Sequence, residues 1–113
     1  MSGFDPVSYF NAGNAVPGQP DIVTRWRGKS WHFASEENRQ KFEANPRAYA
    51  PGFGGFCPVS LAEGRRVQGD PRHFVMIGQR IYLLRSSDAA RELMQDPRKI
   101  MMRAREAWAK TRK

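Results

Sequence analysis

A single cysteine and two histidines are the only thiol and imidazole groups in this chain of 113 residues. One cysteine cannot form a disulfide within the chain, so the sequence does not require an oxidising compartment. No stretch approaches the ~18 apolar residues that a membrane helix needs. The N-terminus lacks a basic stretch followed by an apolar run, so we expect no secretory signal and predict a cytoplasmic, bacterial-type protein.

Sequence patterns of common catalytic sites are also missing. The chain has no GxxxxGK[ST] or GxGxxG phosphate-binding loop and no GxSxG nucleophile elbow. Glu36 and Glu37 are adjacent, so they do not face each other across a helix surface. The sequence therefore favours a non-enzymatic protein. A thiol-based redox activity at the single cysteine is the enzymatic alternative.

Apolar residues are abundant enough for a core, since hydrophobic residues make up 40% of the chain and aromatic residues 12%. The most informative stretch is residues 25–49. Bulky apolar and polar residues alternate around Gly28-Lys29, at Trp26, Trp31 and Phe33. This alternation predicts a short β-hairpin with one buried face.

A helix is expected directly after this hairpin. Ser35 offers a side-chain oxygen to the free N–H groups of the first turn, and two glutamates follow where the helix dipole favours them. Phe42 is the apolar anchor of the helix. Asn45-Pro46 ends it, because a residue before proline avoids the α region.

A second hairpin–helix unit is predicted from about residue 74 to residue 100. The matches at an offset of 50 residues are Gly28–Gly78, Trp31–Ile81 and Phe33–Leu83, and after a one-residue insertion the matches are Ser35–Ser86, Phe42–Leu93 and Pro46–Pro97. Internal duplication and chance similarity of two such units both explain the pattern. In either case we expect the two apolar faces to cover each other in one core.

These patterns predict a single α+β domain in which two β-hairpin–helix units flank a glycine-rich central loop. The expected segments are an irregular N-terminal segment (1–21), a first hairpin–helix unit (22–50), the glycine loop with a short helix (51–72), and a second unit that ends in a basic helix (73–113). The short helix is expected from Pro58 to about Glu63, with Cys57 at its N-cap. The last helix is expected from about Pro97 to Lys110.

Positive charge is concentrated near the C-terminus. The chain has a net charge of +8, and residues 98–113 contribute +6 through seven basic residues and one acidic residue. A basic tail on a nearly neutral body indicates nucleic acid, an acidic protein or an anionic membrane surface as partner, and a solvated helix face is the alternative. The candidate contact residues are Arg98, Lys99, Arg103, Arg105 and Lys110, followed by Arg112 and Lys113.

The stretch WHFASEENRQKFEANPRAY resembles the YHS-domain family. The segments DPVSYF, GGFC and GDP match the longer bacterial form, so the resemblance spans nearly the whole chain. The resemblance implies a small binding module. It also implies copper as a candidate ligand, because YHS domains occur in copper-transporting ATPases. Metal-type members place cysteines where this chain has Ser8, Ala34 and Asn38, which are poor ligands for zinc or copper.

Cys57 is the strongest single candidate for a ligand-binding residue. A thiol at a helix N-terminus is stabilised as thiolate, and a Cys-Pro pair resembles the short haem-regulatory motif. We therefore expect a small ligand, such as copper, another metal ion or haem, at Cys57 and His32, with Phe56 and Tyr9 lining the pocket beside the glycine loop. Burial of Cys57 and Tyr9 in the core and a hydrogen-bonded structural role for His32 are the alternatives. Association into a homo-oligomer is also left open.

Overall fold

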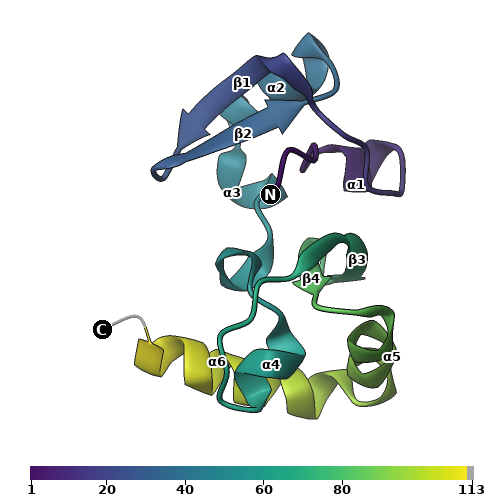
Figure 1. Ribbon diagram of the computed structural model, residues 1–113, viewed down its shortest axis with the longest axis vertical. Helices are drawn as coiled ribbons and strands as arrows, with labels where there is room; N and C mark the ends of the chain where they lie inside the picture. Colours follow the sequence, from purple (N-terminus) through teal and green to yellow (C-terminus); the bar gives the residue numbers. More distant parts are fainter. Residues whose placement is uncertain (112–113) are drawn as a thin grey trace. The chain divides into compact units, whose positions relative to one another are not determined.

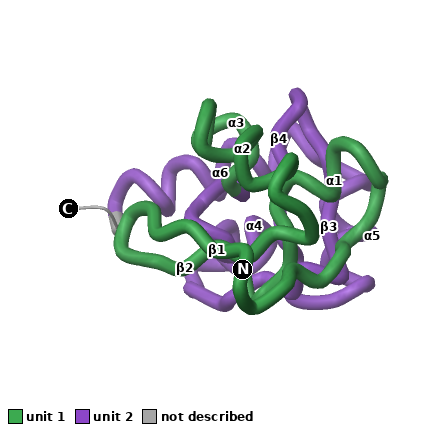
Figure 2. The backbone as a smooth tube through the Cα atoms, turned by 90° about the horizontal axis from the view of Figure 1, so that it is seen from above, with its two compact units in different colours: residues 1–50 green, residues 51–113 purple. Residues whose placement is uncertain are grey.

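Two antiparallel hairpins, each followed by a short helix, dominate the computed structural model (Figure 1), which describes residues 1–111. The chain divides into two units, residues 1–50 and 51–113 (Figure 2). Unit 1 contains α1 (Ser8–Asn11), β1 (Gln19–Trp26), β2 (Lys29–Phe33), α2 (Glu36–Ala44) and α3 (Pro46–Tyr49). Unit 2 contains the 3-10 helix η1 (Gly52–Gly55), α4 (Pro58–Ala62), β3 (Asp70–Ile77), β4 (Arg80–Leu84), α5 (Ser87–Gln95) and α6 (Pro97–Thr111). The predicted α+β class is confirmed.

The two hairpins have the same register. In unit 1 Trp26 pairs with Lys29 and, in unit 2, Ile77 pairs with Arg80. Both hairpins also carry an irregularity in their first strand, between residues 19 and 23 and between residues 70 and 74. The offset between equivalent residues is thus 51 throughout the hairpin, so the one-residue insertion inferred from the sequence is wrong. Phe33 corresponds to Leu84 rather than to Leu83.

The helices after the hairpins start and stop where the sequence predicts. The Ser35 hydroxyl accepts from the N–H of Asn38 and the Ser86 hydroxyl accepts from the N–H of Ala89, each at 3.1 Å. The residues before the two prolines, Asn45 and Asp96, have extended φ values of −156° and −149°. A serine N-cap and a pre-proline stop therefore define both α2 and α5.

Each unit has its own cluster of buried apolar residues. Phe42 of α2 and Leu93 of α5 are fully buried at the centres of the two clusters. The unit 1 cluster is Val7, Trp31, Phe33, Phe42 and Ala50. The unit 2 cluster is Cys57, Val59, Val75, Tyr82, Leu84, Ala89, Leu93 and Met101. The sequence led us to expect a single shared core. The buried apolar residues instead form two clusters, one in each unit.

The segments ahead of the hairpins are more ordered than the sequence predicts. The N-terminal segment 1–21 holds α1 and the first residues of β1, which begins at Gln19 rather than at Ile22. Likewise β3 begins at Asp70, inside the predicted loop 51–72. Gly18 and Gly69 explain both extensions, since each lies so close to the opposite strand that a Cβ atom would overlap its backbone.

The repeat also includes these leading segments, which sequence reasoning missed. Asp5-Pro6-Val7-Ser8 recurs as Cys57-Pro58-Val59-Ser60. The N–H of Asp5 donates to the carbonyl of Val16, and the N–H of Cys57 donates to that of Val67, both at 2.8 Å. Similarly, Gly18 donates to Gly3 and Gly69 donates to Gly55. Nearly the whole backbone pattern of unit 1 is therefore present again in unit 2.

Candidate functional site

A buried carboxyl group organises unit 1. Asp5 has no exposed surface, and its Oδ1 accepts from the N–H of Val7 at 2.8 Å. Its Oδ2 accepts from the N–H of Ala34 at 2.8 Å and from the side-chain amide of Asn38 at 2.7 Å. Ser8 binds the Asp5 carbonyl through its hydroxyl. This network ties the N-terminal segment to the end of β2 and to α2.

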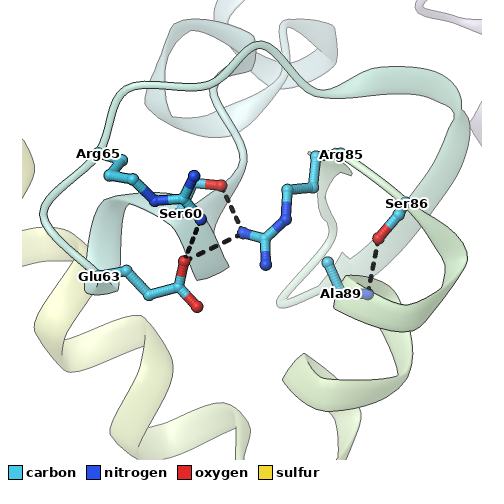
Figure 3. Close-up of polar contacts among 6 residues, drawn as sticks. All are labelled: Ser60, Glu63, Arg65, Arg85, Ser86 and Ala89. Carbon is cyan, nitrogen blue, oxygen red and sulfur yellow. Dashed lines mark hydrogen bonds and ion pairs between the residues drawn. The ribbon is translucent and has the colours of Figure 1, made fainter.

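Unit 2 replaces this network with apolar contacts and an ion pair. Cys57 occupies the position of Asp5, and Ala89 that of Asn38, and both belong to the unit 2 cluster. Arg85, at the position of Ala34, donates to the Ser60 hydroxyl at 2.6 Å and pairs with Glu63 at 3.3 Å (Figure 3). Cys57 is therefore the apolar counterpart of a structural aspartate.

The same cluster of charges acts on the Glu63 carboxyl. Arg65 approaches it to 2.6 Å. This hydrogen bond, with the nearby charge of Arg85, lowers the pKa of Glu63 below its usual value. Both arginines are thus engaged with a single carboxylate, so this corner of unit 2 keeps an excess of one positive charge.

The four residues nominated as ligand contacts have different surroundings. Cys57 and Tyr9 are buried, with exposed fractions of 0% and 2%. His32 is half-buried, and its Nδ1 lies 3.2 Å from the carbonyl oxygen of Gln19, which accepts a hydrogen bond at that distance. Phe56 is half-buried between Arg66, 5.1 Å above its ring, and Trp108. These environments fit the structural alternatives that the sequence left open.

The described residues do not fit a metal centre. Within residues 1–111, no three histidine, cysteine, aspartate or glutamate side chains lie close enough to hold one ion. Ser8 and Asn38, which stand where the YHS resemblance implies cysteine ligands, are bound to Asp5 instead. Hydrogen bonds thus join the parts of unit 1 that a metal would otherwise hold, and copper or haem remains a sequence-based prediction.

Because Cys57 is buried, we expect its thiol to react slowly with reagents in solution. We expect the native chain to react with an aromatic disulfide reagent at least about a hundredfold more slowly than the urea-unfolded chain, because reaction requires opening of the unit 2 cluster. The rate is followed by release of the coloured thiolate at neutral pH, with a Cys57→Ser chain as the blank. Similar reaction rates in the native and the unfolded chain would show that Cys57 is accessible, and they would favour the alternative of a thiol-based redox activity.

Four basic residues of α6 lie on two exposed stripes beside its buried side, and Lys99 is also exposed. Arg98, Met102 and Arg105 are four and three residues apart, so they share one stripe, whereas Arg103 and Lys110 share the other. The buried side between the stripes holds Met101 and Ala104. The candidate cations predicted from the sequence are thus all exposed, but they are divided between two surfaces.

The first stripe borders a groove of about 590 Å³, here called the Met102 groove. Its apolar part comes from Ile77, Met101 and Met102, and the Met102 side chain is 54% exposed. The full lining is Ile77, Pro97, Arg98, Lys99, Met101, Met102 and Arg105. An exposed methionine in a groove that three cations also line is a surface that combines apolar contact with positive charge.

The cations of α6 have no ion-pair partner among the residues that the structure describes. Glu106, the acidic residue of this helix, is not within ion-pair distance of Lys110, although the sequence spacing favours that pair. Cations on other elements form the ion pairs Arg39–Glu36, Lys41–Glu37, Arg65–Glu63, Arg72–Asp70, Arg85–Glu63 and Arg91–Asp88. Elsewhere in the described residues, Arg25, Arg27, Lys29 and Arg66 are also without an ion pair, but they are not gathered on one helix. Positive charge therefore remains uncompensated along α6.

No helix within residues 1–111 combines the length and the apolar composition needed to cross a bilayer. Comparison with protein-family models, with curated proteins and with solved structures finds no match to this chain. The resemblance to the YHS-domain family therefore stays a prediction from the sequence motifs.

Proposed function

We propose that this chain is a non-enzymatic binding module that binds an acidic protein segment in the Met102 groove. The observation that carries the proposal is the set of unpaired cations along α6 within the described residues. Arg98, Lys99 and Arg105 line the groove and supply charge for carboxylates. Met102 supplies apolar contact for a side chain of the partner.

The apolar lining favours an acidic protein segment over a nucleic acid. Phosphate backbones are bound mainly by charge and hydrogen bonds, and they gain little from methionine side chains. An amphipathic acidic helix presents carboxylates beside leucine-like residues and therefore matches both parts of the groove. Ile77 and Met102 would contact its apolar face while Arg98 and Arg105 pair with its acids.

The length of α6 also supports binding of a partner at the Met102 groove. Its counterpart in unit 1, α3, has four residues and ends at Tyr49, whereas α6 has fifteen. Most of α6 therefore has no equivalent in unit 1; one side of this additional part is buried through Met101 and Ala104, and its other side is exposed. Met102 and Arg105, which line the Met102 groove, lie in this additional part.

The proposal is tested by fluorescence anisotropy with a labelled helical peptide that carries glutamates and leucines on adjacent faces. At about 0.15 M salt, where long-range attraction is screened, the double substitution Arg98→Gln and Arg105→Gln should weaken binding about tenfold or more. Met102→Ala should weaken it about fivefold through lost apolar contact.

The matched control is Arg25→Gln with Lys29→Gln, which removes the same charge from unit 1. It should change the peptide affinity less than about twofold. Equal weakening by the two double variants would contradict the proposal. So would tighter binding of a mixed-sequence oligonucleotide than of the peptide at this salt concentration, because nucleic acid would then be the partner.

A further inference from the structure

A second cavity lies on the other side of α6, beside the end of α4. Its volume is about 370 Å³, which is within the ~300–1,000 Å³ range of small-molecule sites. Helix α4 packs against α6 here, in the lower part of unit 2 as drawn in Figure 1. Leu61, Ala62 and Ala107 form its apolar part. We call this feature the α4–α6 cavity.

Charge in the α4–α6 cavity is strongly unbalanced. Four cationic side chains line it against one carboxylate, that of Glu106; the cations are Arg65, Arg66, Arg103 and Lys110. Arg65 is already engaged with Glu63 at 2.6 Å. Arg103 and Lys110 have no ion-pair partner within the described residues, so the cavity keeps an excess of positive charge.

One of these cations is held in place before any ligand arrives. The guanidinium carbon of Arg66 lies 5.1 Å from the centre of the Phe56 ring, and Phe56 in turn packs on Trp108 at 6.0 Å. A guanidinium supported on an aromatic face loses less side-chain freedom when it binds an anion. This gives Phe56, nominated from the sequence as a ligand contact, an indirect role as the support of Arg66.

From this combination we infer that the α4–α6 cavity binds a small organic anion, with a phosphate or carboxylate on an apolar body. Arg66, Arg103 and Lys110 take the anionic group, since guanidinium and ammonium groups bind both oxyanions strongly. The apolar body lies on Leu61, Ala62 and Ala107. The inference does not depend on the proposed function, because Arg98, Met102 and Arg105 do not line this cavity.

The test is a titration of the full ¹⁵N-labelled chain with phenyl phosphate and, separately, with benzoate, at about 0.15 M salt. Saturable shifts are expected for the amides of Ala62, Gly64 and Ala107. Inorganic phosphate should bind at least about tenfold more weakly than phenyl phosphate, because it lacks the apolar body. The tighter of the two aromatic anions identifies the preferred anionic group.

Variants separate this site from the Met102 groove. Arg103→Gln with Lys110→Gln should weaken phenyl phosphate binding about tenfold, whereas Arg98→Gln with Arg105→Gln should change it less than about twofold. All four side chains are exposed, so the fold is retained. Equal weakening by both pairs, inorganic phosphate binding as tightly as phenyl phosphate, or no saturable shift up to about 10 mM ligand would overturn the inference.

Discussion

Replacing Asp5 by alanine is expected to remove most of the stability of unit 1. The substitution leaves three N–H donors without their acceptor: those of Val7 and the Asn38 side chain, which are buried, and that of Ala34, which is half-buried. Each such group costs about 1–3 kcal/mol, so the free energy of unfolding should fall by roughly 3 kcal/mol or more. That is a large part of the ~5–15 kcal/mol that typical domains possess.

Hydrogen exchange of individual amides measures this effect within each unit. Protection of the Ala34 amide should fall by about a hundredfold or more, while the Ala89 amide in unit 2 should change much less. Asp5→Asn keeps the shape and loses at least one acceptor, so its effect should be intermediate. Unchanged protection at Ala34 in the alanine variant would show that the Asp5 network does not hold unit 1 together.

Gly69→Ala is expected to be at least as damaging in unit 2. A Cβ atom at this position would lie 2.3 Å from the carbonyl oxygen of Leu83 and 2.5 Å from its carbonyl carbon. Since the obstacle is backbone within a paired strand, β3 and β4 must separate locally. We expect a loss of about 3 kcal/mol or more, above the usual range for overpacking, measured by urea unfolding.

The matched control for this prediction is Gly78→Ala at the tip of the same hairpin. Its φ is +59° and an added Cβ would meet no atom within 4 Å. Only the left-handed backbone conformation disfavours alanine there, and it should lower the free energy of unfolding by about 1–2 kcal/mol. If Gly69→Ala costs no more than Gly78→Ala, close approach of the strands is not what requires glycine at position 69.

Local rules predicted much of the fold, because their causes lie within a few residues. The caps at Ser35 and Ser86 depend on an N–H three residues away, and the helix stops depend on the following proline. The alternation that predicted burial of Trp31 and Phe33 is equally local. Sequence reasoning was weaker for the hairpin turns. Two residues have a positive φ in each turn, and glycine is the second of them in unit 1 (Arg27-Gly28) but the first in unit 2 (Gly78-Gln79). Aligning the two glycines therefore shifted the inferred register by one residue.

Features that depend on distant residues were missed. Asp5 before a proline indicates a turn, and the turn is present, but its other partners are 29 and 33 residues away. Nothing near Asp5 in the sequence points to Ala34 or Asn38. The recurrence of Pro-Val-Ser after Asp5 and after Cys57 was the available signal. It would have identified Cys57 as the equivalent of Asp5 in the second unit.

The candidate binding surfaces were predicted only in part. The charge of the last helix is visible in the sequence, and its five candidate cations are exposed as expected. The grooves are not visible there, because Ile77 comes from β3 and Arg66 from the segment after α4. Nothing in the sequence indicated that the ring of Phe56, predicted to contact a ligand, lies against Arg66. Arg112 and Lys113, the last two predicted cations, lie outside the described residues.

The most direct test of the central claim is a map of amide shifts in the ¹⁵N-labelled full chain during titration with the acidic amphipathic peptide. At about 0.15 M salt, saturable shifts are expected at Ile77, Arg98, Met102 and Arg105, and these shifts should be lost when Arg98 and Arg105 are replaced by glutamine. Shifts concentrated in residues 1–50, or no saturable shift at any peptide concentration, would contradict the assignment of α6 as the binding element.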